Sequence, residues 1–157
     1  RLTIEGEPNA RLYQCLTGVL RGLAEVDREQ VESLFWYYQL RVAEALGYRP
    51  ELRHCISCRI ELSGSWLWFN PALGGGICAA CGPGNGVRMA GQSLNYLAGL
   101  QGLKTYSKQM LPQAPTRRGE IRTALRGFLE YHGGERSRLR SLEFLDSLNR
   151  SETAPSS

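Results

Sequence analysis

The chain of 157 residues is long enough for one well-buried domain or two very small ones, and it is too short for a large multidomain enzyme. Its composition, 42% hydrophobic and 22% charged, is typical of a folded globular protein, and no apolar run approaches the roughly 20 residues that a membrane-spanning helix needs. The formal net charge of +4 comes mainly from arginine, whose planar fork favours phosphate or carboxylate partners, although a GC-rich genome gives the same bias.

Apolar residues repeat at helical spacing in the first part of the chain. Asn9 follows Pro8 and is a plausible N-cap, so we predict an amphipathic helix over residues 10–25. On its apolar face Cys15 is expected to act as a small buried hydrophobic residue, with redox chemistry as the less favoured role. The predicted apolar face comprises Leu12, Cys15, Leu16, Val19 and Leu23.

A second helix is predicted over residues 28–46. Asp27 and Gln30 have the spacing of a capping box, and Gly47 supplies a C-terminal stop. The three adjacent aromatic residues at 36–38 span about 200° of the helix circumference, so they cannot all face one core. We therefore expect some of them to cover another element or to bind a partner.

Four cysteines carry the strongest signal in the chain. Cys55 and Cys58 form one C-x2-C pair, Cys78 and Cys81 form a second, and 19 residues separate the pairs. This spacing is typical of a zinc site with four thiolate ligands. Two disulfides or free thiols are the alternative, and iron is the alternative metal. A closed four-cysteine site leaves no coordination position for water, so we expect one structural Zn²⁺ and no metal catalysis.

Metal binding changes the net charge of the chain. Four thiolates and one Zn²⁺ together carry −2, so the net charge falls from +4 to about +2, and global charge becomes a weak argument for nucleic-acid binding. Arg53, Arg59 and Arg88 lie close to the cysteine pairs in sequence, where they either offset this negative cluster or reach phosphate. His54 adjoins the first pair, but a complete four-cysteine site leaves it a supporting or surface role.

The segment between the cysteine pairs is predicted to form a β-hairpin. Residues 66–69 form its first strand, residues 70–71 begin the turn, and the glycines at 74–76 lead the chain back. Alternation along the strand places Trp66 and Trp68 on one face. This face either packs on neighbouring elements or stacks nucleic-acid bases.

Three further helices are predicted after the hairpin. The first covers residues 93–103, and a basic loop follows over residues 104–115. The second runs over residues 116–132 and ends before a Gly-Gly pair. Four leucines at helical spacing predict a final helix over residues 139–148, and residues 151–157 are expected to form a disordered tail.

Arg118, Arg122 and Arg126 recur every four residues and form a stripe about 12 Å long on the predicted helix. That length spans several backbone phosphates of a nucleic acid. The alternative is a solvated helix face that Glu120 and Glu130 partly neutralise. The candidate DNA-binding residues are Arg118, Arg122, Arg126, Lys104 and Lys108.

Several short sequence motifs also occur along the chain. Residues 46–52 read Leu-Gly-Tyr-Arg-Pro-Glu-Leu and stand shortly before the first cysteine pair; the others occupy residues 5–9, 11–13, 69–71, 74–81 and 139–145. With the cysteine pairs, these motifs resemble the C-terminal region of the RecO family of bacterial recombination-mediator and DNA-repair proteins, over residues 5 to about 150. The cysteine spacing alone fits many zinc ribbons, and the Leu-Gly-Tyr-x-Pro motif makes the resemblance specific.

The resemblance implies a function that the spacing does not show. RecO-like proteins bind single- and double-stranded DNA, anneal complementary strands, work with RecR, contact the C-terminal tail of single-strand-binding protein, and help to load RecA. The resemblance also implies that the four cysteines are the zinc ligands and that the protein is cytoplasmic and nucleoid-associated, without a membrane partner. Since the sequence contains no catalytic motif or phosphate loop, we expect a non-enzyme.

The predicted architecture is mainly α: a helical bundle with a four-cysteine zinc-ribbon β-hairpin inserted between its second and third helices. Residues 1–8 are expected to be an N-terminal remnant or linker, and residues 9–150 the RecO-like helical domain, with the ribbon at about 53–90. The RecO family carries an N-terminal OB-fold. Because no five-strand segment precedes Asn9 and the chain begins with Arg1, we expect a fragment from which that OB-fold is absent.

Two other functions stay open at this point. One is a structural and protein-interaction module, in which an apolar groove between helices takes a partner peptide and an Arg or Lys holds its terminal carboxylate. The other is an unrelated zinc-ribbon regulator, which predicts sequence-specific binding to duplex DNA.

Overall fold

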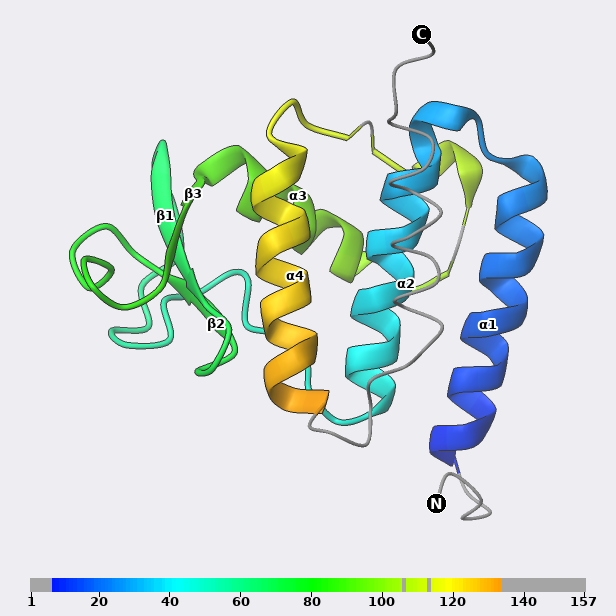
Figure 1. The fold of residues 1–157 in the computed structure, drawn as a ribbon, viewed down its shortest axis with the longest axis horizontal. Coiled ribbons are helices and arrows are strands. Elements are labelled where there is room, and N and C mark those ends of the chain that lie inside the picture. Colours follow the sequence, from blue (N-terminus) through cyan, green and yellow to red (C-terminus); the bar gives the residue numbers. More distant parts are fainter. Residues whose placement is uncertain (1–6, 106, 113, 134–157) are drawn as a thin grey trace, which may run out of the picture.

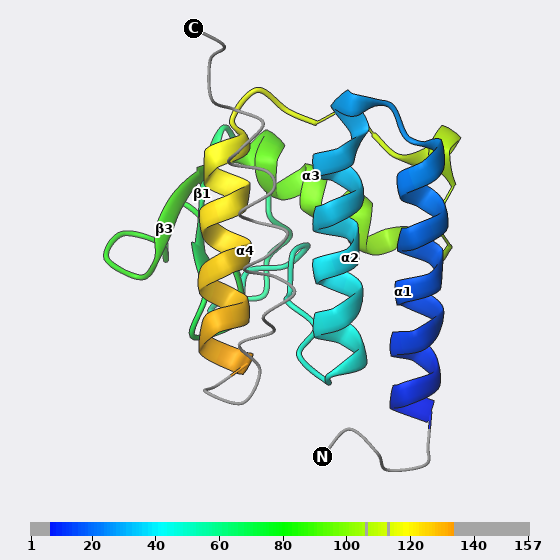
Figure 2. The same cartoon turned by 45° about the vertical axis from the view of Figure 1, so that its right-hand side comes forward.

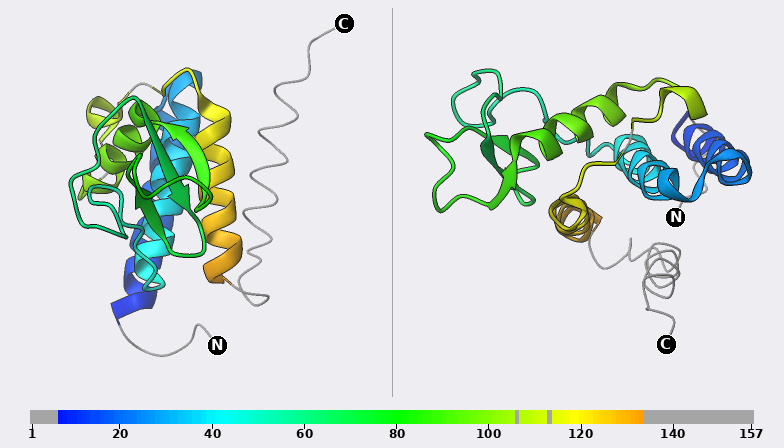
Figure 3. Two further views of the ribbon diagram at one scale, coloured as in Figure 1. Left: turned by 90° about the vertical axis from the view of Figure 1, so that its left-hand side faces the viewer. Right: turned by 90° about the horizontal axis from the view of Figure 1, so that it is seen from above.

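The computed structural model describes residues 7–105, 107–112 and 114–133. In the described residues, four α-helices lie beside a small three-stranded sheet (Figure 1). Three of the helices stand side by side with α2 in the middle (Figure 2), and the fourth, α3, crosses behind them from the sheet toward α1 (Figure 3). The helices are α1 (Glu7–Glu25), α2 (Val31–Ala45), α3 (Gly91–Gly102) and α4 (Arg118–Gly133).

Helix α1 begins earlier than predicted and packs differently. It starts at Glu7, so Asn9 lies inside the helix and does not cap it. Proline at position 8 is compatible with the first helical turn, which needs no N–H donor there. Val19 is buried as expected, but Leu16 and Leu23 expose 45% and 44% of their surface, so the prediction that they belong to the core is wrong. The structure buries the row of α1 that faces α2 and leaves this second apolar row exposed.

Helix α2 begins and ends close to the predicted positions. A short 3-10 turn, η1 (Arg28–Gln30), precedes it, and the predicted capping box between Asp27 and Gln30 is formed. At the other end, the Tyr48 N–H donates to the Ala43 carbonyl at 2.8 Å, which is the long hydrogen bond of a Schellman motif. The predicted stop at Gly47 is therefore confirmed.

The three adjacent aromatic residues of α2 pack in different directions. Trp36 is 1% exposed and meets Tyr96 of α3 edge-on, with ring centroids 5.8 Å apart. Tyr37 is buried beneath the guanidinium of Arg41, and Tyr38 is partly buried. All three can be covered because α2 contacts α1, α3 and α4.

The sheet has the strand order β2-β1-β3, and both pairings are antiparallel. Strands β1 (Trp66–Asn70) and β2 (Gly75–Ile77) form the predicted hairpin. Strand β3 (Val87–Ala90) pairs along the other edge of β1, with Arg88 opposite Trp68. The prediction of a two-stranded hairpin was therefore incomplete, because the four residues of β3 are too short a run to show a strand pattern.

One face of β1 forms part of the main core. Leu67 and Phe69 are fully buried, and the Phe69 ring lies 6.2 Å from Phe128 of α4 in an edge-on contact. The opposite face, with Trp66 and Trp68, is partly exposed. The alternation predicted from the sequence is thus confirmed.

The remaining helices follow their predicted patterns. Helix α3 starts at Gly91, directly after β3, and buries Leu94, Leu97 and Leu100, which repeat at helical spacing. Helix α4 ends at Gly133, at the predicted glycine pair, and the basic loop before it contains a 3-10 turn, η2 (Lys108–Met110). The predicted helix at 139–148 and tail at 151–157 lie outside the described residues. Among the helices that the structure describes, none is both long and apolar enough to cross a membrane.

A candidate metal centre and its neighbouring surfaces

Two tight turns present the four predicted cysteines. In the first turn the Arg59 N–H donates to the Cys55 carbonyl at 2.8 Å, and in the second the Gly82 N–H donates to the Cys78 carbonyl at 2.9 Å. Both turns therefore close with the same backbone hydrogen bond, four residues apart in the chain. Each turn brings the two sulfurs of one C-x2-C pair toward the other pair.

The four sulfurs lie at the spacing that one tetrahedral ion requires. All four Sγ atoms lie within 4.8 Å of one another, and Cys58 Sγ and Cys78 Sγ are 3.7 Å apart. Sulfurs bound at roughly 2.3 Å at the corners of a tetrahedron would be about 3.8 Å apart. The residues present, four cysteines with their sulfurs gathered in one small volume, thus fit a four-thiolate metal ion.

The protonation of the cluster also favours a cation. Burial opposes ionisation of Cys55, but the N–H groups of Cys78, Cys58 and Ser57 donate to its sulfur and lower the pKa of this thiol to about 6. Hydrogen bonds from Cys81 to the sulfurs of Cys78 and Cys58 raise the pKa of Cys81 to about 12. One sulfur is therefore prepared to be a thiolate while another retains its proton, as expected when four thiols share one small volume. A bound divalent cation would remove this conflict.

This arrangement can hold a metal ion, and four thiolate ligands are the full complement of a tetrahedral structural site. Within the described residues the four cysteines form the one cluster of three or more His, Cys, Asp or Glu side chains suited to a metal. His54 is exposed, and its Nδ1 lies 3.9 Å from Glu51 Oε1. Its place at the surface agrees with the supporting role expected from the sequence.

The strands and the metal-binding turns form one unit. The Gly76 N–H donates to the Glu51 carbonyl at 2.8 Å, and the Ile56 N–H donates to the Gly76 carbonyl at 3.0 Å, so the segment before and through the first turn borders β2. A side chain at Gly76 would collide with Leu62 and with Leu94 of α3. The Gly-Gly-Gly run is needed here for this close approach of backbone to the core.

Trp68 connects the sheet to the second turn. Its ring lies so close to Gly82, the residue after Cys81, that a Cβ atom at this position would collide with it. Of the two roles considered for the tryptophan face, Trp68 therefore has the packing role.

Helix α4 holds the sheet at both of its ends. At its C-terminal end, His132 Nε2 lies 2.9 Å from the Pro71 carbonyl at the β1–β2 turn. At its N-terminal end, Glu120 Oε2 accepts hydrogen bonds from the Ala90 N–H at 3.0 Å and from the Ser93 hydroxyl at 3.1 Å, at the junction of β3 and α3. The position of the metal-binding unit on the helices is thus set by polar contacts as well as by the core.

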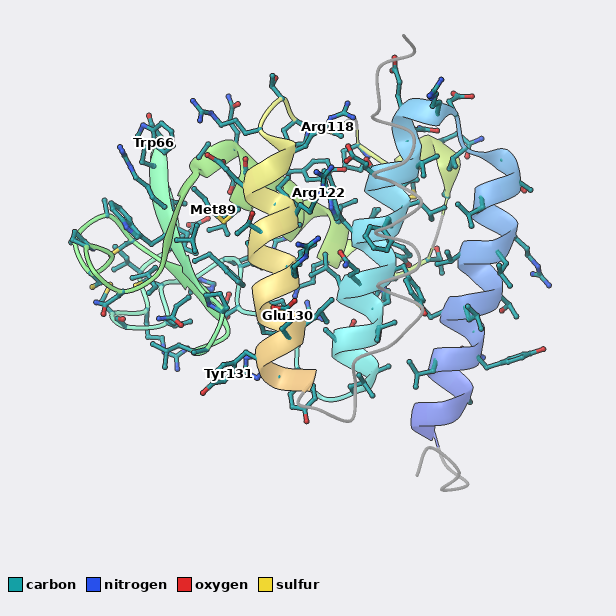
Figure 4. All side chains as sticks on the ribbon, in the orientation of Figure 1. Trp66, Met89, Arg118, Arg122, Glu130 and Tyr131 are labelled. Carbon is teal, nitrogen blue, oxygen red and sulfur yellow. The ribbon has the colours of Figure 1, made fainter. Side chains whose placement is uncertain are left out.

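Two of the three stripe arginines bind a carboxylate from another helix. Arg118 Nη1 lies 2.8 Å from Glu32 Oε2, and Arg122 Nη2 lies 2.6 Å from Glu32 Oε1. The Glu32 side chain is only 11% exposed. Figure 4 shows both arginines in the space between α4 and α2. As a solvated helix face, the stripe was expected to have its positive charge partly neutralised by Glu120 and Glu130. The carboxylate that binds Arg118 and Arg122 belongs instead to Glu32 of α2.

Of the other candidate DNA-binding residues, Arg126 shares α4 with this pair, whereas the two lysines lie elsewhere. Arg126 is exposed one turn further along α4. Lys104 lies at the edge of a pocket between α1 and α2, and Lys108 begins η2, its side chain being outside the described part of the structure. The structure thus places the five residues in at least two separate regions around α2.

The pocket that Lys104 borders has a volume of about 500 Å³. Arg41 lines it as well, and the Nη2 atom of Arg41 is buried without a hydrogen-bond partner among the described residues, although its Nη1 atom binds Glu44 at 2.8 Å. Cys15 also lines the pocket, where burial raises the pKa of its thiol to about 11 and the charge of Arg41 partly offsets this. Cys15 is therefore a protonated, half-buried thiol, in agreement with the inert role predicted for it.

Sequence reasoning missed two arrangements at these surfaces. The first is Glu32, whose sequence signal was a carboxylate in the first turn of an otherwise largely apolar helix. The second is at Trp66, where two guanidiniums from distant parts of the chain, Arg88 and Arg117, lie over one indole ring. Both arrangements join residues that are far apart in sequence, so no local pattern indicates them.

Comparisons with known proteins bear on the same region. The family model described as the C terminus of recombination protein O matches residues 1–143. A DNA repair protein RecO from Pelotomaculum thermopropionicum is 39% identical over 147 residues, which cover 92% of this chain and 55% of that protein. A DNA repair protein RecO from a Roseiflexus species is 32% identical over 150 residues, which cover 94% of this chain and 52% of that protein. The chain thus spans about half the length of these curated relatives. No solved structure matches it.

Proposed function

The chain belongs to the RecO family of DNA-repair proteins, whose C-terminal region it matches, and from this premise we propose that it is the metal-stabilised DNA- and partner-binding region of a recombination mediator. In this role it binds single- and double-stranded DNA, supports the annealing of complementary strands, and works with RecR and the tail of single-strand-binding protein in loading RecA. These activities follow from the family resemblance. The chain contributes recognition and no bond chemistry.

The observation that carries this proposal is the closed cluster of four sulfurs within 4.8 Å of one another. A structural ion with four thiolate ligands supplies folding free energy and no reactive water. It supports a role in which the metal holds a binding surface in place. We assign the ion as Zn²⁺; iron is the other metal that four thiolates suit, and its colour in the visible range would reveal it at once.

We propose that the arginines of α4 contribute phosphate contacts. Arg118 and Arg122 keep 43% and 39% of their side chains exposed while they share Glu32, so each retains N–H donors on its outer side. Glu32 neutralises one of these two charges. The salt dependence of binding is the appropriate measurement, because each phosphate contact to a single strand contributes about 0.7 to the slope of log K against log salt.

The ion pairs with Glu32 determine which variants can test the arginine stripe. Replacing the stripe arginines alone would leave Glu32 buried without a partner and would destabilise the fold. The variant to use is therefore Glu32→Gln combined with alanine at Arg118, Arg122 and Arg126, and its matched control is Glu32→Gln alone. We expect the fourfold variant to have a salt slope smaller than that of its control by roughly 2 for oligonucleotide dT20. Equal slopes would exclude the stripe as a phosphate-binding surface.

A second candidate function is favoured by the pocket between α1 and α2. The unpartnered Nη2 of Arg41 and the ammonium of Lys104 offer positive charge beside half-buried apolar surface, which suits the terminal carboxylate of an acidic peptide. An acidic peptide that ends in Phe should bind the chain, and Lys104→Ala should weaken this binding, whereas Arg21→Ala on the exposed surface of α1 should not. Peptide binding without any binding of DNA would favour the protein-interaction module over the DNA-binding proposal.

A further inference from the structure

The outer face of the sheet carries an unusual group of side chains at Trp66. The Cζ atom of Arg88 lies 4.2 Å from the centroid of the Trp66 ring, and the Cζ atom of Arg117 lies 4.9 Å from it. Trp66 comes from β1, Arg88 from β3, and Arg117 immediately precedes α4. Figure 4 shows Trp66 at the outer edge of the molecule, at the same end as the start of α4.

This group remains accessible at the solvent-facing side of β1, whereas the inner side of the strand is buried. Trp66 is partly exposed, Arg88 is exposed, and 57% of the Arg117 side chain is exposed. The inner residues of β1 fill the core, and Trp68 on the same face packs against the second metal-binding turn. Both tryptophans of this face are partly exposed, but Trp68 packs on the second metal-binding turn, and Trp66 is the one that lies beside the two guanidiniums.

The charges of the group are only partly balanced. Arg88 forms no salt bridge within the part of the chain that the structure describes, and its described contact is the indole ring. Arg117 lies 3.4 Å from Glu120 Oε1, but the other oxygen of that carboxylate is bound at the β3–α3 junction. Two guanidiniums beside one ring repel each other, and an exposed cation–π contact contributes little stability, so packing alone does not account for the pair.

A guanidinium that lies over an indole ring can still donate from its planar fork of N–H groups to another molecule. Such a fork binds phosphate oxygens in pairs, and loses less side-chain freedom when it does so. The planes of the guanidiniums and the exposed part of the indole also offer stacking surface for an unpaired base. The faces of the bases in a duplex are already stacked on one another, so this combination suits a single strand.

We propose that Trp66, Arg88 and Arg117 form a contact site for single-stranded nucleic acid, in which the guanidiniums bind phosphate and the stack takes a base. The site rests on the proposed function for the choice of DNA as the partner. It is distinct from the arginines of α4 that share Glu32, since Arg117 faces the sheet and Arg118 faces α2.

The test uses the full chain with its metal bound and dT20 as the probe. Trp66→Ala and Arg88→Ala should each weaken binding by about tenfold, within the range measured for loss of a base-stacking residue. Arg88→Ala should also reduce the salt slope by about 0.7, whereas Arg88→Lys, which keeps the charge but loses the planar fork, should retain the slope and lose affinity. The charge-matched control is Arg21→Ala on α1, which should bind within twofold of the parent protein.

Three further measurements separate this site from a general effect. Metal content and the urea midpoint of every variant show whether it is folded. Binding of dT20 should also quench tryptophan fluorescence, and Trp66→Phe should remove most of that quenching while it retains part of the affinity.

The possible outcomes distinguish the site from the proposed function. If the parent chain binds dT20 and folded Trp66→Ala and Arg88→Ala variants bind it equally well, the site is wrong and the DNA-binding function stands. If the parent chain does not bind dT20, both are wrong. If Trp66→Ala weakens binding to an acidic peptide or to a dT20·dA20 duplex as much as binding to dT20, the assignment to a single strand is wrong.

Discussion

Glu32→Gln is the substitution that tests most clearly how α4 is fixed to α2. Glu32 accepts two charge-assisted hydrogen bonds, at 2.8 Å from Arg118 and 2.6 Å from Arg122, in a site where only 11% of its side chain is exposed. A hydrogen bond to a charged group contributes about 1.5–3 kcal/mol. Since glutamine keeps one weaker acceptor and both guanidiniums are partly hydrated, we expect a net loss of about 2 kcal/mol.

The assay is urea unfolding of the metal-bound chain, followed by circular dichroism at 222 nm. Glu130→Gln is the matched control, because it removes the same charge from an exposed position of α4 and should change the free energy of unfolding by less than about 0.5 kcal/mol. In a double-mutant cycle, Glu32→Gln and Arg122→Gln should show a coupling of about 1 kcal/mol. If Glu32→Gln lowered the free energy of unfolding by no more than the control does, the reasoning would be refuted. The contacts of Glu32 with Arg118 and Arg122 would then contribute nothing measurable to stability.

Three further predictions test the packing around the sheet and the helices. Gly82→Ala should push Trp68 from the second metal-binding turn, lower the free energy of unfolding by about 1–3 kcal/mol and weaken metal retention against a chelator. His132→Ala should cost about 1–2 kcal/mol in urea unfolding through loss of its hydrogen bond to the β1–β2 turn and of its aromatic contacts; a cost near zero would mean that this end of α4 is not held by the sheet. On α1, Val19→Ala should lower the free energy of unfolding by about 1–2 kcal/mol, because Val19 is buried. Leu20→Ser, at a position 59% exposed, should lower it by less than about 0.5 kcal/mol. A larger loss for Leu20→Ser than for Val19→Ala would contradict the packing of α1 described above.

The features that could be predicted from the sequence are those with a local cause. The stop at Gly47 depends on backbone geometry within six residues, and the cysteine spacing depends on turns of four residues, so both patterns are visible in the chain. The hairpin between the cysteine pairs is local in the same sense. The pairing of Trp68 with Ile77 confirms it.

The features that could not be predicted depend on which elements meet. Leu16 and Leu23 repeat at helical spacing as well as Val19 does, and periodicity does not reveal that α2 covers only one of the two apolar rows of α1. Arg118 reaches Glu32 across 86 residues of sequence, so neither reading of the arginine stripe, as a phosphate-binding surface or as a solvated face, included this ion pair. Long-range contacts thus decide how many of the arginines are available to a ligand.

The central claim is that one ion bound by Cys55, Cys58, Cys78 and Cys81 joins the two turns that border the sheet and thereby stabilises the sheet. The most direct measurement combines elemental analysis of the protein, purified without added metal or chelator, with titration of its thiols. The account predicts one zinc per chain, released stoichiometrically as these four thiols react, with loss of the sheet on release. Protein that is folded but free of metal, or in which the cysteine pairs are oxidised to disulfides, would contradict it.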